Sequence, residues 1–513
     1  MEKGTVYLVG AGPGDPGLIT WRGLEILRAA DVIIYDRLVN PELLLEARSD
    51  ARLIYVGKAA SRHSLSQDEI NQLLADEAKA GYSVCRLKGG DPFLFGRGGE
   101  EADHLVNQGI PFVVVPGVTS ALAVPAYAGI PVTDRRGASS LAIVTGHEDI
   151  EKTESSVNWG ALAQAADTLV VLMGTKNLRE ITGELLSGGR KGTMPAAVIR
   201  WGTTGRQRMI VSDLAHIADE VERRRLTAPA ILVVGDVVSM HQRLAWFERR
   251  PLLGLRILVL RPRHQASRLA DLLRDAGAEP IICPVIRIEP IAAEKGRLTA
   301  LMEQGWNWVL FTSANGVDCF EGQLRSAGLD WRALAGASLG AIGEPTAAAL
   351  EGRGLKVDFI STQAISDAMG KELPGISSET RVLLPRAVEA RGVLPEILRK
   401  RGAHVETVQT YRVSPDRDGA LQLPDTLEKK KADVVTFTSS SMVRAAVEAV
   451  GAKSFEGCVV ACIGPVTAQT ARECGLRVDI EAKVYTIPGL METLEAYVKE
   501  HGKQDPHLRG DEE

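Results

Sequence analysis

The stretch VYLVGAGPGDPGLITWRGLEILRAADVIIY, residues 6–35, indicates the fold of the chain. It begins with a short apolar run at 6–9, passes through a glycine-rich turn and a helical pattern at 21–30, and ends with a second apolar run at 32–35. A strand, a helix and a second strand in this order form the unit from which parallel sheets are built. The sequence therefore predicts an α/β fold.

The same alternation continues along the first quarter of the chain. Further apolar runs occur at 53–56, 84–87 and 112–115, and a helical pattern lies between the first two at 67–80. This order predicts parallel sheets covered by helices. Ligands of such sheets bind at the carboxyl ends of the strands, so the residues that directly follow each strand are the candidates for function.

The composition is that of an ordinary globular protein and excludes several classes. The 513 residues are 45% hydrophobic and 24% charged, and about 150 residues per domain predicts three or four domains, or two large ones. A net charge of −5, without a basic excess in either half, argues against a nucleic-acid partner. The low aromatic content of 5% argues against a stacking platform for single strands.

The sequence shows no signal for a membrane, for export or for a metal. No apolar run approaches the ~20 residues that span a bilayer, and a strand pattern stands where a signal peptide would be. The six cysteines are scattered without a CxxC pair, which argues against a zinc site and indicates reduced thiols. These features predict a cytoplasmic protein with no membrane contact and no metal.

The turns after the expected strands carry unusual residues. In GAGPGDP at 10–16, Asp15 stands where a dinucleotide-binding GxGxxG turn needs its third glycine, which disfavours that use. The most specific block is RLKGGDPFLFGRGGEE at 86–101, whose glycines open a backbone pocket and whose Asp91 offers a carboxylate to an amino group or a ribose. PGVTSA at 116–121 places hydroxyls at a helix start, where they either bind a ligand or cap the helix.

Taken together, these blocks resemble the tetrapyrrole methylase family, and within it the uroporphyrinogen-III C-methyltransferases. The resemblance covers residues 3–247 and includes ADVIIYDRLV, HSLSQDEIN, VVPGVTSA, AYAGIPVT, VTGH, VLMG and PAILVVGDVV in the family's order. It implies two consecutive α/β domains with a site for S-adenosylmethionine in the cleft between them. The cofactor contacts that it implies are Pro13, Gly89, Gly90, Asp91, Leu94, Thr119, Ser120, Met173, Gly202, Pro229 and Ala230.

The same resemblance implies the groups that do the chemistry. Asp36 corresponds to the family's candidate base and Lys58 to its candidate acid. Without the family, Asp36 reads as an ion-pair partner of Arg37 or a helix cap, and Lys58 reads as a solvated surface charge. Because the implied substrate is a polycarboxylate, arginines are expected at the mouth of the cleft. The candidates are Arg37, Arg97, Arg135 and Arg136.

The second half of the chain repeats itself. RILVL from residue 256 resembles RVLLP from 381, WVLFTSANGV from 308 resembles VVTFTSSSMV from 434, and GAIGEPTA from 340 resembles ACIGPVTA from 461. If the segment that begins at 256 is called A and the segments that begin at 308 and 340 are called B, the copies follow the order A, B, A′, B′. This order predicts two similar α/β lobes with a cleft between them rather than a solenoid. Hydroxyls follow several of the strands, where they either bind anions or cap helices. They are Thr312, Ser313, Thr346, Thr438, Ser439, Ser440 and Thr467.

This second half resembles the uroporphyrinogen-III synthase family over residues 255–498. The matching text is RILVLRP, FTSANGV, AIGEPTA, LLPRA, TYRV, FTSSSMV and IGPVTA. The resemblance implies closure of hydroxymethylbilane to uroporphyrinogen III without a cofactor. Arg386 and the hydroxyls would then hold carboxylates, and Tyr411 would donate a proton or, alternatively, pack as a hinge aromatic.

Both resemblances together give the expected organisation. The expected segments are a methyltransferase half at 1–248 with sub-domains at about 1–135 and 136–248, a linker at 249–254, a synthase half at 255–498 with lobes at about 255–285 plus 412–498 and about 288–411, and a polar tail at 499–513.

The chain is thus interpreted as a bifunctional tetrapyrrole enzyme. It would make uroporphyrinogen III and methylate it twice with S-adenosylmethionine to precorrin-2, towards sirohaem or cobalamin. The family further implies a homodimer through the methyltransferase half. Two alternatives stay open, namely a C-terminal half that binds substrate without catalysis, and a methylase that acts on a later precorrin.

Overall fold

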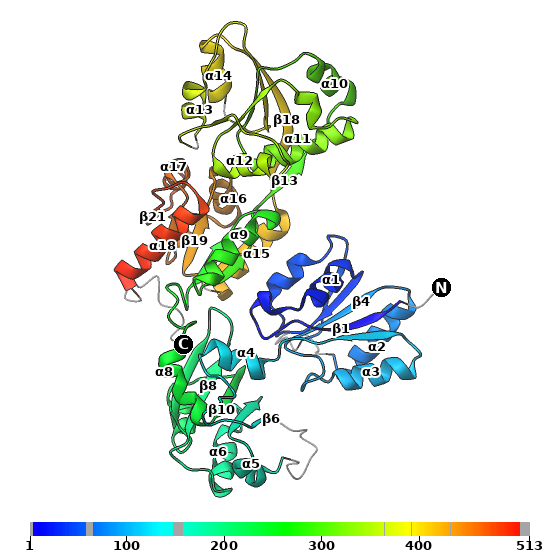
Figure 1. Ribbon diagram of the computed structural model, residues 1–513, viewed down its shortest axis with the longest axis vertical. Helices are drawn as coiled ribbons and strands as arrows, with labels where there is room; N and C mark the ends of the chain where they lie inside the picture. Colours follow the sequence, from blue (N-terminus) through cyan, green and yellow to red (C-terminus); the bar gives the residue numbers. More distant parts are fainter. Residues whose placement is uncertain are drawn as a thin grey trace. The chain divides into compact units, whose positions relative to one another are not determined.

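The computed structural model describes residues 4–57, 65–146, 157–363, 365–390, 392–430 and 432–502. The chain divides into two compact units. Unit 1 consists of Met1–Ile257, Ala270–Ile281 and Val498–Glu513, and unit 2 of Leu258–Leu269 and Ile282–Tyr497. Sheets accompanied by helices make up both units (Figure 1), so the α/β class predicted from the sequence is confirmed.

The first sheet of unit 1 is five-stranded and parallel throughout. In order across the sheet, its strands are β3 (Arg52–Tyr55), β2 (Val32–Tyr35), β4 (Val84–Lys88), β1 (Val6–Gly10) and β5 (Phe112–Val115). The accompanying helices are α1 (Trp21–Ala29), α2 (Gln67–Lys79), α3 (Gly98–Asn107) and the 3-10 helices η1 (Pro16–Leu18) and η2 (Pro41–Glu46). Because the strands are parallel, their carboxyl ends and the loops that follow them meet at one edge.

Side-chain alternation decides which helices cover which face of this sheet. Val32 and Ile34 of β2 pack with residues of α2 and α3, whereas Ile33 packs with residues of α1. Figure 1 shows α1 on one side of the sheet and α2 and α3 on the other. The apolar run at 32–35 is therefore continuous because both faces of its strand are covered.

The second sheet of unit 1 is mixed, which corrects the expectation of parallel sheets. In order, its strands are β6 (Leu141–Thr145), β7 (Thr168–Leu172), β10 (Ala230–Val234), β8 (Pro195–Arg200) and β9 (Arg208–Asp213). β6 and β7 are parallel, whereas β10 runs antiparallel to β7 and β8, and β9 antiparallel to β8. A buried apolar run does not reveal its strand's direction, so periodicity alone could not predict this arrangement.

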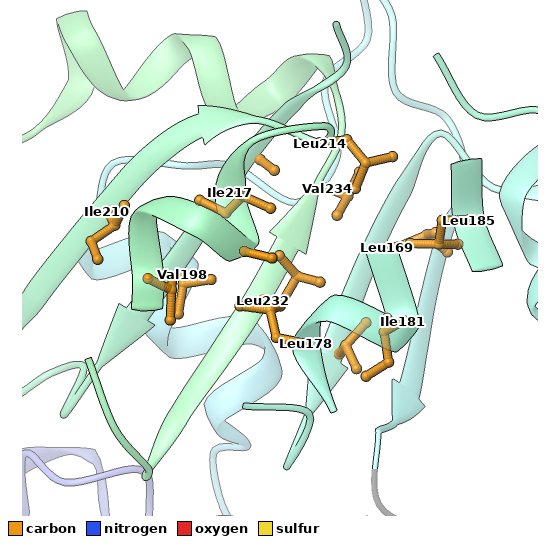
Figure 2. Packing of buried hydrophobic residues seen from close by; sticks show 14 of the residues in the cluster. Leu169, Leu178, Ile181, Leu185, Val198, Ile210, Leu214, Ile217, Leu232 and Val234 are labelled. Atoms are coloured by element: carbon orange, nitrogen blue, oxygen red, sulfur yellow. The ribbon is translucent and has the colours of Figure 1, made fainter. Parts of the chain in front are cut away.

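Helices accompany this second sheet as well. They are α4 (Ser120–Tyr127), α5 (Trp159–Ala165), α6 (Leu178–Ser187), α7 (Ile217–Arg223), α8 (His241–Leu244) and the 3-10 helix η3 (Asp236–Met240). Figure 2 shows Val198 of β8 and Leu232 of β10 in one buried cluster with Ile181 of α6 and Ile217 of α7. This packing holds the strand ends of the second sheet in place.

The remaining strands form two further sheets. The third sheet has the order β12 (Glu279–Ile282), β11 (Arg256–Val259), β19 (Val434–Phe437), β20 (Val459–Cys462) and β21 (Ile480–Glu481). The fourth has the order β13 (Ile286–Pro290), β18 (His404–Pro415), β17 (Arg381–Ala387), β14 (Trp308–Phe311), β15 (Ser338–Ala341) and β16 (Phe359–Ile360).

The helices of this half follow the same alternation. They are α9 (Arg263–Asp275), α10 (Lys295–Glu303), α11 (Ala314–Ser326), α12 (Glu344–Glu351), α13 (Ser366–Glu372), α14 (Val393–Lys400), α15 (Arg417–Lys430), α16 (Ser440–Val450), α17 (Pro465–Glu473), α18 (Ile487–His501) and the 3-10 helices η4 (Trp331–Leu334) and η5 (Ala452–Phe455).

The third and fourth sheets repeat one strand order. β11, β19, β20 and β21 follow one another in the third sheet as β17, β14, β15 and β16 do in the fourth. Each sheet therefore joins the A-type strand of one sequence repeat to the B-type strands of the other. The long strand β18 pairs with β17 in parallel over residues 404–411 and with β13 antiparallel over 411–415.

Candidate active sites

Three loops at the carboxyl edge of the first sheet pack backbone against backbone. The Gly12 N–H donates to the Gly90 carbonyl at 3.2 Å, and the Gly90 N–H donates to the Gly12 carbonyl at 2.7 Å. A Cβ at Gly117, after β5, would lie 2.3 Å from the Gly90 carbonyl oxygen. The predicted cofactor residues Pro13, Gly89 and Gly90 thus belong to a junction whose close approach requires glycine.

Asp91 fastens this junction through its carboxylate. Oδ1 accepts the N–H groups of Phe93 at 2.8 Å and Leu94 at 3.0 Å, and Oδ2 accepts the N–H of Gly117 at 2.9 Å. We expected this carboxylate to face an amino group or a ribose. In the structure, it holds the backbone that carries Leu94 and ties that backbone to the loop after β5.

The hydroxyl turn after β5 caps a helix. Thr119 is the N-cap of α4, and its Oγ1 accepts the N–H of Ala121 at 3.3 Å. Ser120 is the first residue of the same helix. The capping interpretation is therefore confirmed for Thr119, and its own O–H proton is still available to a ligand.

The other predicted cofactor residues lie at one edge of the second sheet. Met173 follows β7, Gly202 lies in the turn after β8, and Pro229 and Ala230 stand at the start of β10. The antiparallel pairing of β10 with β7 and β8 puts these three strand ends side by side. Met173 is 50% exposed and has a left-handed φ of 58°, and such strained turns gather at functional sites.

Contacts within unit 1 join these two groups of residues. The Asp15 N–H donates to Thr203 Oγ1 at 3.1 Å, and the Tyr127 hydroxyl donates to Asp15 Oδ2 at 2.7 Å. A Cβ at Gly202 would lie 2.2 Å from Cγ1 of Val124 in α4. The loop after β1 is thus in direct contact with the loop after β8, and the predicted residues of both sheets form one region.

Asp36 directly follows β2 and borders this region. Its Oδ1 accepts the Leu38 N–H at 3.1 Å, and its Oδ2 lies 3.7 Å from Nη2 of Arg86. The ion pair is therefore made with Arg86 and not with Arg37, the partner in the alternative interpretation, which is exposed. A Cβ at Gly89 would lie 2.8 Å from Leu38 Cβ, so the Asp36 loop touches the loop after β4.

The structure describes the predicted arginines but not the predicted acid. Lys58 lies outside the described residues. Arg97 is exposed and pairs with Glu100, with 3.0 Å between Nε and Oε1. Arg136 pairs with Asp134, whose pKa its guanidinium lowers to about 2. Arg135 is exposed as well.

One group of ionisable residues was not predicted to belong to the site. Arg86 and Lys88 of β4 and Glu101 of α3 are buried, although all three side chains are ionisable. The sequence gives only a partial signal, two basic residues in the strand pattern at 84–88, whereas the burial of the strand and the contact with Glu101 are visible only in the structure. Such residues are almost never fully buried unless they are paired.

In unit 2, Tyr411 is brought together with two other predicted residues. Its hydroxyl shares a hydrogen bond of 2.9 Å with Ser313 Oγ, and Arg386 lies close enough for its charge to act on the phenol. Burial has the larger effect and raises the pKa of this phenol. Burial also lowers the pKa of Arg386. Ser313 additionally caps α11, since its Oγ accepts the Gly316 N–H at 3.0 Å.

The matching hydroxyls of the third sheet are engaged locally. Ser439 caps α16 by accepting the Met442 N–H at 3.4 Å, and Thr438 donates to the sulfur of Met442. Ser440 Oγ and Thr470 Oγ1 share a hydrogen bond of 2.8 Å. These residues therefore follow β19 as predicted, and of the three only Ser439 caps the helix.

Two predicted hydroxyl residues lie in the interior. Thr346 of α12 and Thr467 of α17 are only 3% and 5% exposed. This differs from our expectation that they face a substrate, because the first turn of each helix packs onto its sheet. Thr312, which follows β14, is only half-buried.

A cavity of about 570 Å³ occurs elsewhere on the fourth sheet. Its lining includes Arg381 and His404, which open β17 and β18, together with Trp306 and Arg399. It therefore lies at the amino ends of these strands. None of the predicted site residues lines it.

The cysteines are free thiols, as the sequence predicts. Burial raises the pKa of Cys85 to about 12 and that of Cys458 to about 11. Among the described residues, no group of three or more His, Cys, Asp and Glu side chains could hold a metal ion. Within the same residues, no helix has the length and apolar character needed to cross a membrane.

Known families match both halves of the chain. Residues 5–218 match the tetrapyrrole (corrin/porphyrin) methylases, and residues 267–492 match uroporphyrinogen-III synthase HemD. A porphyrin biosynthesis protein HemD of Ruminiclostridium josui is 38% identical over 498 residues, which cover 96% of this chain and 98% of that protein. A uroporphyrinogen-III C-methyltransferase of Bacillus subtilis strain 168 is 46% identical over 362 residues, or 70% of this chain and 74% of that protein.

A solved structure also aligns with part of the chain. It is a uroporphyrin-III C-methyl transferase from Thermus thermophilus complexed with S-adenyl homocysteine, which is 39% identical. The alignment covers 46% of this chain and 99% of that one, with a TM-score of 0.40. From the family matches and the full-length relative, the chain belongs to the tetrapyrrole methylases in its N-terminal half and to the uroporphyrinogen-III synthases in its C-terminal half.

Proposed function

We propose that the chain is a bifunctional enzyme of tetrapyrrole synthesis. Its C-terminal half closes hydroxymethylbilane to uroporphyrinogen III, and its N-terminal half methylates that product twice to precorrin-2. The observation that carries the proposal is the gathering of the predicted cofactor residues of both sheets of unit 1 into one region beside Asp36. The full-length relative supports the pairing of the two activities in one chain.

The region fits S-adenosylmethionine as the methyl donor. A Cβ at Gly90 would meet nothing within 4 Å, so open space adjoins the backbone of the loop after β4. Met173, which follows β7 of the second sheet, offers a half-exposed apolar side chain. The backbone of the glycine loops would bind the polar groups of the cofactor, and the Thr119 hydroxyl is able to donate to it.

The chain's own residues have a modest chemical task in methyl transfer. When bound, the cofactor supplies a methyl group that its sulfonium already activates. The loops must align an electron-rich pyrrole carbon with that methyl group. Asp36 then accepts the proton that the cationic tetrapyrrole must lose elsewhere on the ring system once the new C–CH3 bond has formed, and its carboxylate stabilises the positive charge on the ring beforehand.

Ring closure in the synthase half depends on proton donation. Burial keeps the Tyr411 phenol protonated, and Ser313 fixes the direction of its hydroxyl. Tyr411 is therefore suited to donate a proton to the departing hydroxyl of hydroxymethylbilane. Arg386 supplies a positive charge next to it for a substrate carboxylate.

Two separate assays of the purified full-length chain test the proposal. In the first, uroporphyrinogen III and methyl-labelled S-adenosylmethionine should give a tetrapyrrole that carries two labelled methyl groups. In the second, hydroxymethylbilane alone should give the type III isomer. An unlabelled product in the first assay would contradict the methyltransferase, and a type I product in the second would contradict the synthase.

A further inference from the structure

The buried charges Arg86, Lys88 and Glu101 lie beneath the edge of the first sheet where Asp36 stands. The side chains of Arg86 and Lys88 are 5% exposed, and that of Glu101 is 0% exposed. Alternate residues of a strand share a face, so Arg86 and Lys88 point to the same side of β4. This is the side covered by α2 and α3, because Val84, which points to the same side of β4, packs with residues of these two helices.

Glu101 binds both cations with a single oxygen. Its Oε1 lies 2.7 Å from Lys88 Nζ and 3.0 Å from Arg86 Nε. Its Oε2 is buried and has no hydrogen-bond partner among the described residues. Arg86 is held further by Nη1, which lies 3.3 Å from the carbonyl oxygens of both Ile34 and Leu87. The guanidinium is therefore fixed in position and direction.

Stability alone does not account for this cluster. Burying charges costs free energy, and well-packed apolar residues in their place are often neutral or more stable. Desolvation is also the main reason why the pKa of Lys88 is lowered, although the interaction with Glu101 acts to raise it. A carboxylate oxygen without a partner adds to the cost of the cluster.

The cluster ends on Asp36. Nη2 of Arg86 lies 3.7 Å from Oδ2 of Asp36, while the Leu38 N–H holds Oδ1 at 3.1 Å. The two oxygens of this carboxylate thus have different partners, which sets the plane of the carboxylate. Arg86 and Lys88 carry two positive charges against one negative charge on Glu101, so the cluster as a whole attracts the Asp36 carboxylate.

We propose that Arg86, held by Glu101 and Lys88, is a positioning residue that orients the Asp36 carboxylate for methyl transfer. This inference rests on the proposed function of the N-terminal half. Arg86 does not touch substrate in this account, because it is buried and acts only through Asp36.

Arg86→Lys is the substitution that tests this proposal. Lysine keeps the buried positive charge but lacks the planar fork that reaches Glu101 and Asp36 at once. Because misplacing a reacting group by 1 Å can cost ~100-fold in rate, we expect kcat for methyl transfer to fall by 10-fold to 100-fold. The KM for S-adenosylmethionine and the binding of S-adenosylhomocysteine should stay within twofold of the unsubstituted chain.

A matched control and a double substitution separate positioning from structure. Arg190→Lys makes the same change at another buried arginine of unit 1, which donates to the carbonyls of Ala163, Ala166 and Asp167, and should leave kcat unchanged. In an Asp36→Asn background, Arg86→Lys should have no further effect on kcat, because coupled residues are not additive. Glu101→Gln replaces Arg86→Lys in the same comparison if the latter does not fold.

The outcomes of this experiment are distinct. The positioning role would be overturned if Arg86→Lys lowered kcat by the same factor in the unsubstituted chain and in the Asp36→Asn background. It would also be overturned if Arg86→Lys did not lower kcat at all. Either result would leave the proposed function intact. Absence of methyl transfer by the unsubstituted chain would overturn the proposed function and this inference together.

Discussion

At the scale of single residues, the proposed methyl transfer rests on the carboxylate of Asp36. It stands at the end of β2, beside the glycine loops, and the Leu38 N–H and Arg86 hold it in place. Pattern reasoning with the family found Asp36 because it follows an apolar strand. It could not find Arg86, Lys88 and Glu101, because their importance arises from a contact between β4 and α3 that no local pattern records.

Asp36→Asn should lower methyl transfer without changing cofactor binding. An amide is neither a base nor an anion, so we expect a loss of about 10²–10⁴ in kcat. The measurement is the initial rate of label transfer to uroporphyrinogen III, together with the binding of S-adenosylhomocysteine. Asp219→Asn, a change in an exposed ion pair with Arg179, is the control and should keep the full rate.

Tyr411→Phe should slow ring closure in the synthase half. It removes the proton donor and the hydrogen bond to Ser313, whose net worth is about 1 kcal/mol. We expect the type III isomer to give way to the type I isomer of spontaneous closure. Tyr7→Phe makes the same change in the methyltransferase half and should leave the isomer ratio unaltered. An unchanged ratio for Tyr411→Phe would exclude the phenol as the donor.

The pH dependence of Tyr411 has a defined sign. Burial raises its pKa in the folded chain above the ordinary value of 10.0. Its stabilising contribution is therefore complete below pH 10 and is lost as pH rises through the folded pKa. Urea unfolding of unit 2, followed between pH 9 and 11, should show a shallower alkaline loss for Tyr411→Phe than for the unsubstituted chain. Parallel curves would contradict this linkage.

At the scale of elements, the glycine loops of the first sheet decide whether the cofactor region forms. Periodicity predicted the strands and helices around these loops, and the motifs predicted the loops. The direction of β10 in the second sheet was not predictable, because the apolar residues of 231–234 suit a buried strand of either direction. That direction is what brings Ala230 next to Met173.

Gly117→Ala should disrupt this junction. Its Cβ would lie 2.3 Å from the Gly90 carbonyl and 2.6 Å from Gly10 Cα, and both are backbone atoms. Overpacking of this kind costs about 1–3 kcal/mol, and the shifted loops should weaken S-adenosylhomocysteine binding. Thermal unfolding and equilibrium binding measure the two effects. Binding equal to that of the unsubstituted chain would contradict the close approach.

Gly183→Ala is the matched control for this substitution. Gly183 lies inside α6, and a Cβ there would meet nothing within 4 Å. Because alanine restricts the unfolded chain and favours the helix, it should stabilise unit 1 by about 0.4–1 kcal/mol. It should leave S-adenosylhomocysteine binding unchanged.

At the scale of the whole molecule, the chain carries domains of two families. The family matches occupy separate stretches, and one relative is similar to this chain across both of them. The repeat in the second half could be detected in the sequence. The common strand order of the third and fourth sheets now shows how the repeats interleave. The burial of Thr346 and Thr467 could not be predicted from the sequence, because a hydroxyl residue after a strand occurs both in hydrophobic cores and at binding sites.

The two activities should be separable in the intact chain. Asp36→Asn should strongly slow methylation while it leaves the type III isomer unchanged, and Tyr411→Phe should lower the share of type III isomer while it leaves methylation unchanged. A mixture of the two variant proteins should then convert hydroxymethylbilane to the labelled type III product. Absence of the labelled type III product from the mixture would show that at least one of the two substitutions damages both halves.

One measurement tests the central claim most directly. The unsubstituted full-length chain is given hydroxymethylbilane and methyl-labelled S-adenosylmethionine, and the isomer and label of the product are determined together. The account predicts a type III tetrapyrrole with two labelled methyl groups. A labelled product of type I alone would contradict the synthase half, and an unlabelled type III product would contradict the methyltransferase half.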